Sequence, residues 1–152
     1  MTLTYSNSNI YELYDRDFYL WIQETARLVR EGKFSELDIE NLVDEVESLG
    51  RWEKREVDES FLAVIRYLLK YKYCEQQQRE VWRVAIGEHR TRIKEILADS
   101  PSLRALLLEY FTQIYQDAKE LVELEMELAP DSLPSESPFT IEEFLDEDFL
   151  PL

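Results

Sequence analysis

The sequence predicts an all-α fold, a four-helix bundle-like domain organised along one long helix at about residues 38–73. Apolar residues recur there at steps of three, four, seven or eight, which keeps them on one face of an α-helix. The charged run at residues 53–56 excludes a strand, because a strand with one buried face needs an apolar residue at every second position. The apolar face consists of Leu42, Val46, Leu49, Val57, Phe61, Val64, Leu68 and Tyr71.

This long helix exceeds what one small core can cover. Ser35 or Asp38 caps its start, and at about 1.5 Å per residue it extends for roughly 50 Å. A two-helix hairpin buries too little around residues 38–50, so either the chain bends near Gly50 or two copies pair there. We expect two copies to pair as a homodimer.

The N-terminal residues predict an arm and then a helix. Residues 1–14 are rich in Ser and Asn and predict a loosely held arm, and residues 15–152 predict a single helical domain. Asp15 or Asp17 caps the first helix by accepting hydrogen bonds from its free backbone N–H groups. Gly32 ends this helix, because glycine adopts the left-handed conformation that follows a last turn.

Three further helices follow the long one. The apolar spacing predicts a third helix over residues 79–98. Ser100 as cap and Pro101 in the first turn predict a fourth helix, which runs to about residue 128. The capping box at residues 140–143 then opens a short C-terminal helix.

Charge is large and unevenly distributed. The 152 residues include 17 basic and 33 acidic side chains, a net charge of −16. Residues 1–50 carry a net −7, residues 51–98 a net +3 and residues 99–152 a net −12. So acidic a surface repels nucleic acid and anionic membranes, and we therefore expect neither as a partner.

Cysteine usage and hydropathy indicate the cellular compartment of the protein. Cys74 is the only cysteine, so no internal disulfide is possible, and a reducing compartment is the best fit. The N-terminus lacks the basic start and apolar core of a signal peptide, and no run reaches the 18 apolar residues of a membrane span. We therefore expect a cytoplasmic protein.

Four motifs together resemble a known family. They are YDRDFYLW at residues 14–21, EVESLG at 45–50, SPSL at 100–103 and FLDEDFLP at 144–151. Their combination and order resemble a bacterial family abundant in cyanobacteria, catalogued as domain of unknown function 29. The resemblance covers nearly the whole chain and implies a compact helical bundle. It implies no activity.

The acidic residues of the first two helices invite a metal-site interpretation. A ferritin-like di-metal site needs a Glu-x-x-His motif on each of two helices, and this sequence has none. Magnesium held by carboxylates alone remains open, but a solvated helix face is the simpler interpretation, so we predict no cofactor. The metal-ligand candidates are Glu24, Asp44, Glu45, Glu47 and His89.

Three polar residues fall on the predicted core. His89, the only histidine, lies between apolar positions, and a hydrogen bond to Ser60 would satisfy a buried imidazole. A metal ligand or general base is the alternative role for His89. Glu53 lies on the apolar seam, where free N–H groups near Leu103 could anchor its carboxylate.

A basic face runs along the third helix. It offers an anion or an acidic partner a binding surface, or it neutralises the chain's own acidic segments at 120–127 or 142–148. We also expect Phe144 and Phe149 to dock on the bundle, although the closing segment could instead be a recognition peptide. The residues of this basic face are Arg79, Arg83, Arg90 and Lys94.

No catalytic signature is present in the sequence. It has no Gly-rich phosphate loop, and Cys74 has no nucleophile motif around it. We therefore interpret the protein as a protein-interaction or regulatory helical module that binds a protein partner or a second copy. The alternative is a small helical-bundle enzyme, a divalent-metal-dependent hydrolase that uses the metal-ligand candidates named above.

Overall fold

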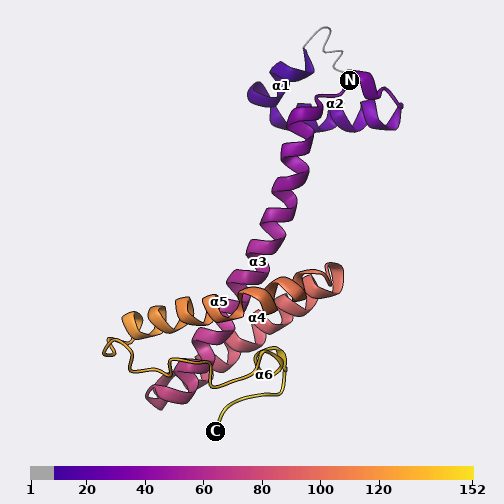
Figure 1. Ribbon diagram of the computed structural model, residues 1–152. Coiled ribbons are helices and arrows are strands. Elements are labelled where there is room, and N and C mark those ends of the chain that lie inside the picture. The colour runs from indigo at the N-terminus through magenta and orange to yellow at the C-terminus, as the bar shows by residue number, and fades with distance from the viewer. Residues whose placement is uncertain (1–8) are drawn as a thin grey trace. The chain divides into compact units, whose positions relative to one another are not determined.

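The computed structural model describes residues 9–152, and within them every regular element is a helix (Figure 1). The predicted all-α class is confirmed. None of these helices combines the length and the apolar character that a membrane crossing requires. The elements are α1 (Ile10–Arg16), α2 (Phe18–Arg30), η1 (Phe34–Glu36), α3 (Ile39–Tyr73), η2 (Gln76–Gln78), α4 (Arg79–Asp99), α5 (Leu103–Glu125) and α6 (Ile141–Leu145).

The chain divides into two compact units. The first extends to Arg51 and the second runs from Trp52 to the C-terminus, so the division falls inside α3. Below they are called the N-terminal unit and the C-terminal unit. Because one helix supplies residues to both, the single domain expected over residues 15–152 stays a prediction.

The long helix α3 confirms the predicted span. Asp38 is its cap, because its carboxylate accepts a hydrogen bond from the backbone N–H of Asn41 at 3.4 Å. Helical structure continues through Gly50, where an added Cβ would meet no atom within 4 Å. Sequence periodicity therefore identified this helix and its start correctly.

The N-terminal arm differs from the prediction. Residues 10–14 form most of α1, because the Asn9 side chain accepts a hydrogen bond from the N–H of Tyr11 at 3.3 Å and caps the turn. The rest of the expected arm, residues 1–8, lies outside the described residues. Asp17 caps α2, as predicted, by accepting from the N–H of Leu20 at 3.0 Å.

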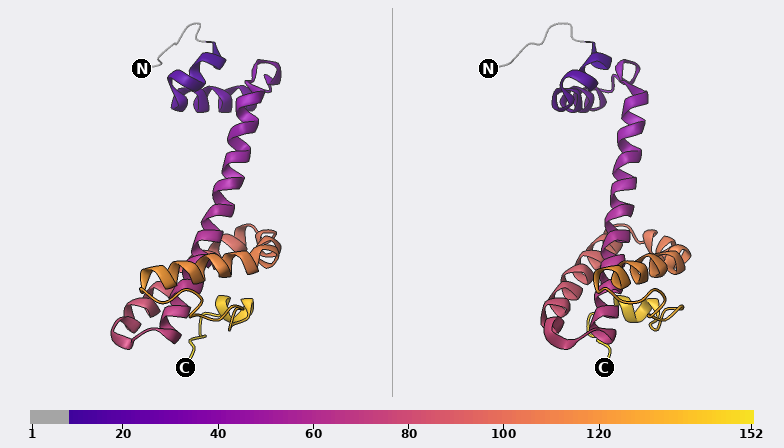
Figure 2. Two further views of the ribbon diagram at one scale, coloured as in Figure 1. Left: turned by 60° about the vertical axis from the view of Figure 1, so that its left-hand side comes forward. Right: turned by 90° about the vertical axis from the view of Figure 1, so that its left-hand side faces the viewer.

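The C-terminal unit contains the hydrophobic core. The second half of α3 packs against α4 and α5, and the C-terminal segment closes the core (Figure 2). Phe144 is fully buried and packs edge-on against Phe61 and Phe139. Phe149 packs on Phe139, so the predicted docking of the closing aromatics is confirmed.

Helix α5 corrects two details of the sequence interpretation. The predicted start, with Ser100 as cap and Pro101 in the first turn, is wrong: the helix begins at Leu103, and Pro101 lies in a preceding turn in which the N–H of Leu103 donates to the Ser100 carbonyl at 3.1 Å. Apolar spacing in the sequence predicts an inward face that includes Tyr110, Leu121 and Leu124, but all three side chains are exposed. Beyond Ile114 the core side instead consists of Tyr115, Ala118 and Val122.

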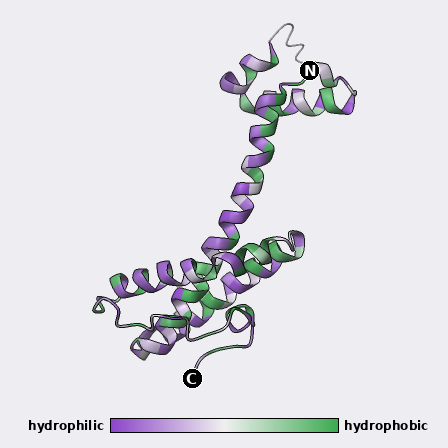
Figure 3. Ribbon diagram, in the orientation of Figure 1, coloured by the Kyte–Doolittle hydropathy of each residue, from purple (hydrophilic) through white to green (hydrophobic). Residues whose placement is uncertain are grey.

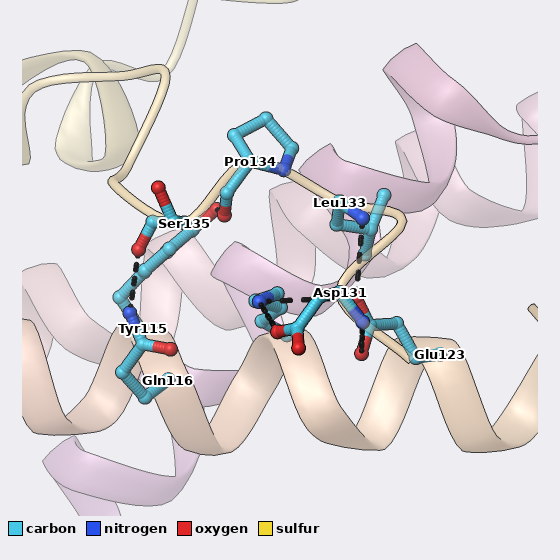
Figure 4. A network of polar contacts seen from close by, with 8 residues as sticks. Tyr115, Gln116, Glu123, Asp131, Leu133, Pro134 and Ser135 are labelled. Atoms are coloured by element: carbon cyan, nitrogen blue, oxygen red, sulfur yellow. Dashed lines mark hydrogen bonds and ion pairs between the residues drawn. The ribbon is translucent and has the colours of Figure 1, made fainter. Parts of the chain in front are cut away.

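Polar side chains hold the loop that follows α5 (Figure 4). The Glu123 carboxylate accepts hydrogen bonds from the N–H groups of Asp131 and Leu133, at 3.2 and 3.1 Å. The buried Lys119 ammonium donates to Asp131 at 2.7 Å, which lowers the pKa of that carboxyl group. Two further bonds join the Tyr115 hydroxyl to the Pro134 carbonyl at 2.6 Å and the Gln116 amide to the Ser135 carbonyl at 2.7 Å.

Arg90 fastens the C-terminal segment to α4. Its guanidinium donates to the backbone carbonyls of Phe144 and Phe149 at 2.8 Å and of Glu143 at 3.0 Å. The side chain is only 3 % exposed, and this burial lowers its pKa. One cation thereby satisfies three carbonyl groups that flank and end the short helix α6.

Candidate functional site: an apolar groove in the N-terminal unit

In the N-terminal unit, α2 crosses the first turns of α3 (Figure 1). Side chains of these two helices line an open apolar groove. Its volume is about 670 Å³. Helix α2 contributes Phe18, Ile22 and Val29 to the lining. Helix α3 contributes Leu42, Val46 and Leu49.

The groove exists because each helix has more apolar surface than its neighbour can cover. Trp21, Thr25 and Leu28 on α2 are buried, whereas the apolar side chains that line the groove from this helix, Phe18, Ile22 and Val29, remain exposed. On α3, Val46 is 60 % exposed and Leu49 is 68 % exposed. Figure 3 shows hydrophobic segments both on α2 and on these turns of α3. The helix pair therefore leaves one apolar face open to solvent.

Two polar contacts hold α1 and α2 against α3 beside this groove. The Tyr14 hydroxyl donates to the Glu45 carboxylate at 2.5 Å, and this bond raises the pKa of Tyr14 to about 12. The Trp21 indole N–H donates to the Asp38 carboxylate at 3.3 Å. Both carboxylates therefore have structural partners.

The groove is nearly free of charge. Of the residues that line it, only Arg30 and Glu45 are ionisable with a charge at neutral pH, and Glu45 is bonded to Tyr14. Arg30 forms no ion pair with any residue between positions 9 and 152. The surface of the groove is therefore mostly apolar.

The metal-ligand candidates do not gather in one place. Glu24 is bonded to the Arg27 guanidinium at 2.5 and 2.9 Å, which lowers the pKa of Glu24, and Glu47 pairs with Arg51 at 3.7 Å. His89 belongs to the C-terminal unit. Among residues 9–152, no three His, Cys, Asp or Glu side chains are arranged so that they could hold a metal ion.

Two of the expected core contacts are not formed. His89 is only half-buried and stacks on the Tyr67 ring at 6.2 Å, so solvent can reach it and no bond joins it to the buried Ser60. Glu53 does not reach the start of α5, where the N–H of Leu103 already has a backbone acceptor. Glu53 instead lines a surface pocket of the C-terminal unit with a volume of about 530 Å³.

The basic face of α4 is occupied by the chain itself. Arg83 pairs with Glu80, and Lys94 pairs with Glu147 of the C-terminal segment at 3.0 Å. Arg90 is buried under the same segment, and Arg79 lies over the Tyr71 ring with its guanidinium carbon 5.0 Å from the ring centre. These contacts match the self-neutralising alternative more closely than an open anion site.

The groove was not among the sites expected from the sequence. Its apolar residues were assigned to a core, because periodicity reports a face of a helix and says nothing of what covers it. The one signal that pointed to this region was the shortage of partners for residues 38–50 of the long helix, from which the pairing of two copies was expected.

Comparison with known proteins identifies a family. No curated protein and no solved structure matches the chain. The model of one family, described as domain of unknown function DUF29, matches residues 13–150, which include parts of both compact units. This match confirms the resemblance carried by the four sequence motifs. The chain therefore belongs to this family, a domain of unknown function.

Proposed function

We propose that the protein is a helical protein-interaction module, and that the groove between α2 and α3 binds an amphipathic helix of another polypeptide chain. The exposure of Val46 and Leu49 on a regular helix is the observation that carries this proposal. Contiguous apolar surface of this kind on a folded unit is typical of interaction sites.

A helix is the occupant that suits this groove best. One wall of the groove is itself a helix whose apolar side chains recur at three- and four-residue steps, Leu42, Val46 and Leu49. A second helix with the same spacing can interdigitate with such a wall. Because the lining carries almost no free charge, apolar side chains must supply most of the contact.

The experiment compares the mass of the native protein with that of two variants purified gently from the cells that produce it. Native mass spectrometry should find the chain bound to a second polypeptide. Val46→Asp should release the bare chain of 18.2 kDa, because a carboxylate cannot be buried in the groove without a partner.

Leu124→Asp is the matched control. Leu124 is an exposed leucine of α5 in the C-terminal unit, outside the groove. This variant should keep the second polypeptide. A wild-type protein that is always a single chain, or a Val46→Asp variant that keeps its partner, would contradict the proposal.

A further inference from the structure

We infer that the helix bound in this groove is α3 of a second copy of the same chain, so that the protein is a dimer through its N-terminal unit. This inference rests on the proposed function and names the partner. The exposed turns of α3 carry the sequence feature that identifies this partner.

Those turns carry a short heptad pattern. Ile39 and Val46 occupy one set of core positions and Leu42 and Leu49 the other, in the order a, d, a, d. β-Branched residues at a and leucine at d favour two-stranded pairing of like helices. We call the strip formed by these four residues the seam of α3. Its residues Ile39, Val46 and Leu49 are more than half exposed, so no other element of the N-terminal unit covers the seam completely.

The positions of the charged residues on α3 allow a second copy of the chain to approach this seam. At about 100° per residue, Glu40, Asp44 and Glu47 lie on the side of the helix that faces away from the seam. The positions a and d along which two copies would meet are therefore uncharged. Glu45, the acidic residue that flanks them, accepts the hydrogen bond of the Tyr14 hydroxyl. The pattern stops at Glu53, the next a position, where two copies would oppose carboxylates.

A heterologous basic helix fits these observations less well. The lining offers it one carboxylate, Glu45, and that group already accepts the Tyr14 hydrogen bond. A self-complementary apolar face, in contrast, satisfies both partners with one surface, as a two-fold symmetric dimer requires. The second copy also brings its own Ile22 and Val29, which extend the apolar contact beyond α3 alone.

The test uses the full-length chain purified without any other protein. Sedimentation velocity from about 1 µM to about 100 µM should detect a species of twice 18.2 kDa. Val46→Asp and, independently, Leu49→Asp should each raise the dimer dissociation constant at least about thirtyfold. Leu124→Asp should leave it unchanged. Circular dichroism should find the helix content of all three variants equal to that of the wild type, because each position is exposed.

The outcomes separate this inference from the proposed function. A purified chain that stays single at every concentration overturns the dimer, and so does a dimer that both aspartate variants retain. If such a single chain still carries a different polypeptide when isolated from its cells, and Val46→Asp releases that polypeptide, the interaction module stands and only the second copy is wrong. If the chain is single in both preparations, both proposals fail.

Discussion

The two compact units treat the same long helix differently. In the C-terminal unit, α3 is enclosed by α4, α5 and the C-terminal segment, and its apolar residues Phe61, Val64 and Leu68 are completely buried. In the N-terminal unit, α1 and α2 cover only one side, and Val46 remains largely exposed although it continues the same stripe. Burial along α3 therefore depends on how many neighbouring elements the chain supplies, because the apolar stripe continues through both units.

The largest effect should come from a pair of phenylalanine substitutions, one in each unit. Phe144→Ala removes a fully buried ring between α3 and the C-terminal segment and should lower the free energy of unfolding by about 4 kcal/mol. Phe34→Ala removes a ring that is 63 % exposed and should change it by less than about 0.5 kcal/mol. Urea denaturation followed by circular dichroism measures both. Equal losses would contradict the contrast between the units.

Substitution of the cation under the C-terminal segment should have the next largest effect. Arg90→Lys keeps the charge but cannot reach three carbonyls at once, so we expect a loss of about 2 kcal/mol. Faster proteolysis of the segment after residue 138 should accompany it. Arg83→Lys, on an exposed arginine paired with Glu80, should change neither quantity measurably. If the C-terminal segment of Arg90→Lys resists proteolysis as well as that of the wild type, Arg90 does not hold this segment in place.

Substitution of two glycines by alanine, one in each unit, should change the free energy of unfolding in opposite directions. Gly32 ends the turn after α2 with φ of 70°, so Gly32→Ala should cost about 1 kcal/mol. Gly87 lies inside α4 with no atom within 4 Å of an added Cβ, so Gly87→Ala should gain about 1 kcal/mol through helix propensity. Thermal and urea unfolding of both variants test the signs, and a stabilised Gly32→Ala would show that the turn is not as described.

The smallest effect concerns the ion pairs between α3 and α5 and depends on pH. Burial alone raises the pKa of Glu125, but hydrogen bonds and charge from Lys70 and Arg66 outweigh it and leave the pKa below the ordinary 4.5. The carboxylate therefore stabilises the fold above that value, and this contribution disappears as the pH falls through the lowered pKa. At neutral pH, Glu125→Gln should cost less than about 1 kcal/mol.

The matching measurement is urea unfolding between about pH 7 and about pH 3. The difference between wild type and Glu125→Gln should shrink toward the acidic end. Glu120→Gln is the control, because Glu120 is exposed and forms no ion pair with another described residue. A difference that stays constant across this range would mean that Glu125 does not contribute through its charge.

Much of the fold could be predicted from local sequence signals. The cap at Asp38, the cap at Asp17 and the capping box at residues 140–143 act within one turn of the chain, so the sequence reveals them directly. Helix spans could be predicted as well, because the spacing of apolar residues is also a local property of the sequence. The docking of Phe144 could be predicted because so aromatic a tail would otherwise expose apolar surface.

The remaining features depend on contacts between distant segments. The core side of α5 includes Lys119 and Glu123, which hold the following loop, and no hydropathy pattern places charged residues in a core. Arg90 was read as part of a surface face, although its partners are backbone carbonyls some 50 residues away, at separations of 53 to 59. The groove depends on a missing neighbour, which the composition of a helix cannot report.

The thiol reactivity of Val46→Cys, in a Cys74→Ser background, reports directly whether the exposed face of α3 is an interface. A maleimide reagent should modify the introduced thiol slowly at about 100 µM protein, because association of two copies covers the groove. After dilution to about 0.1 µM the copies separate, and the reaction should be rapid. Asp44→Cys, on the opposite side of the helix, should react rapidly at both concentrations. Equal rates for Val46→Cys at both concentrations would contradict the account.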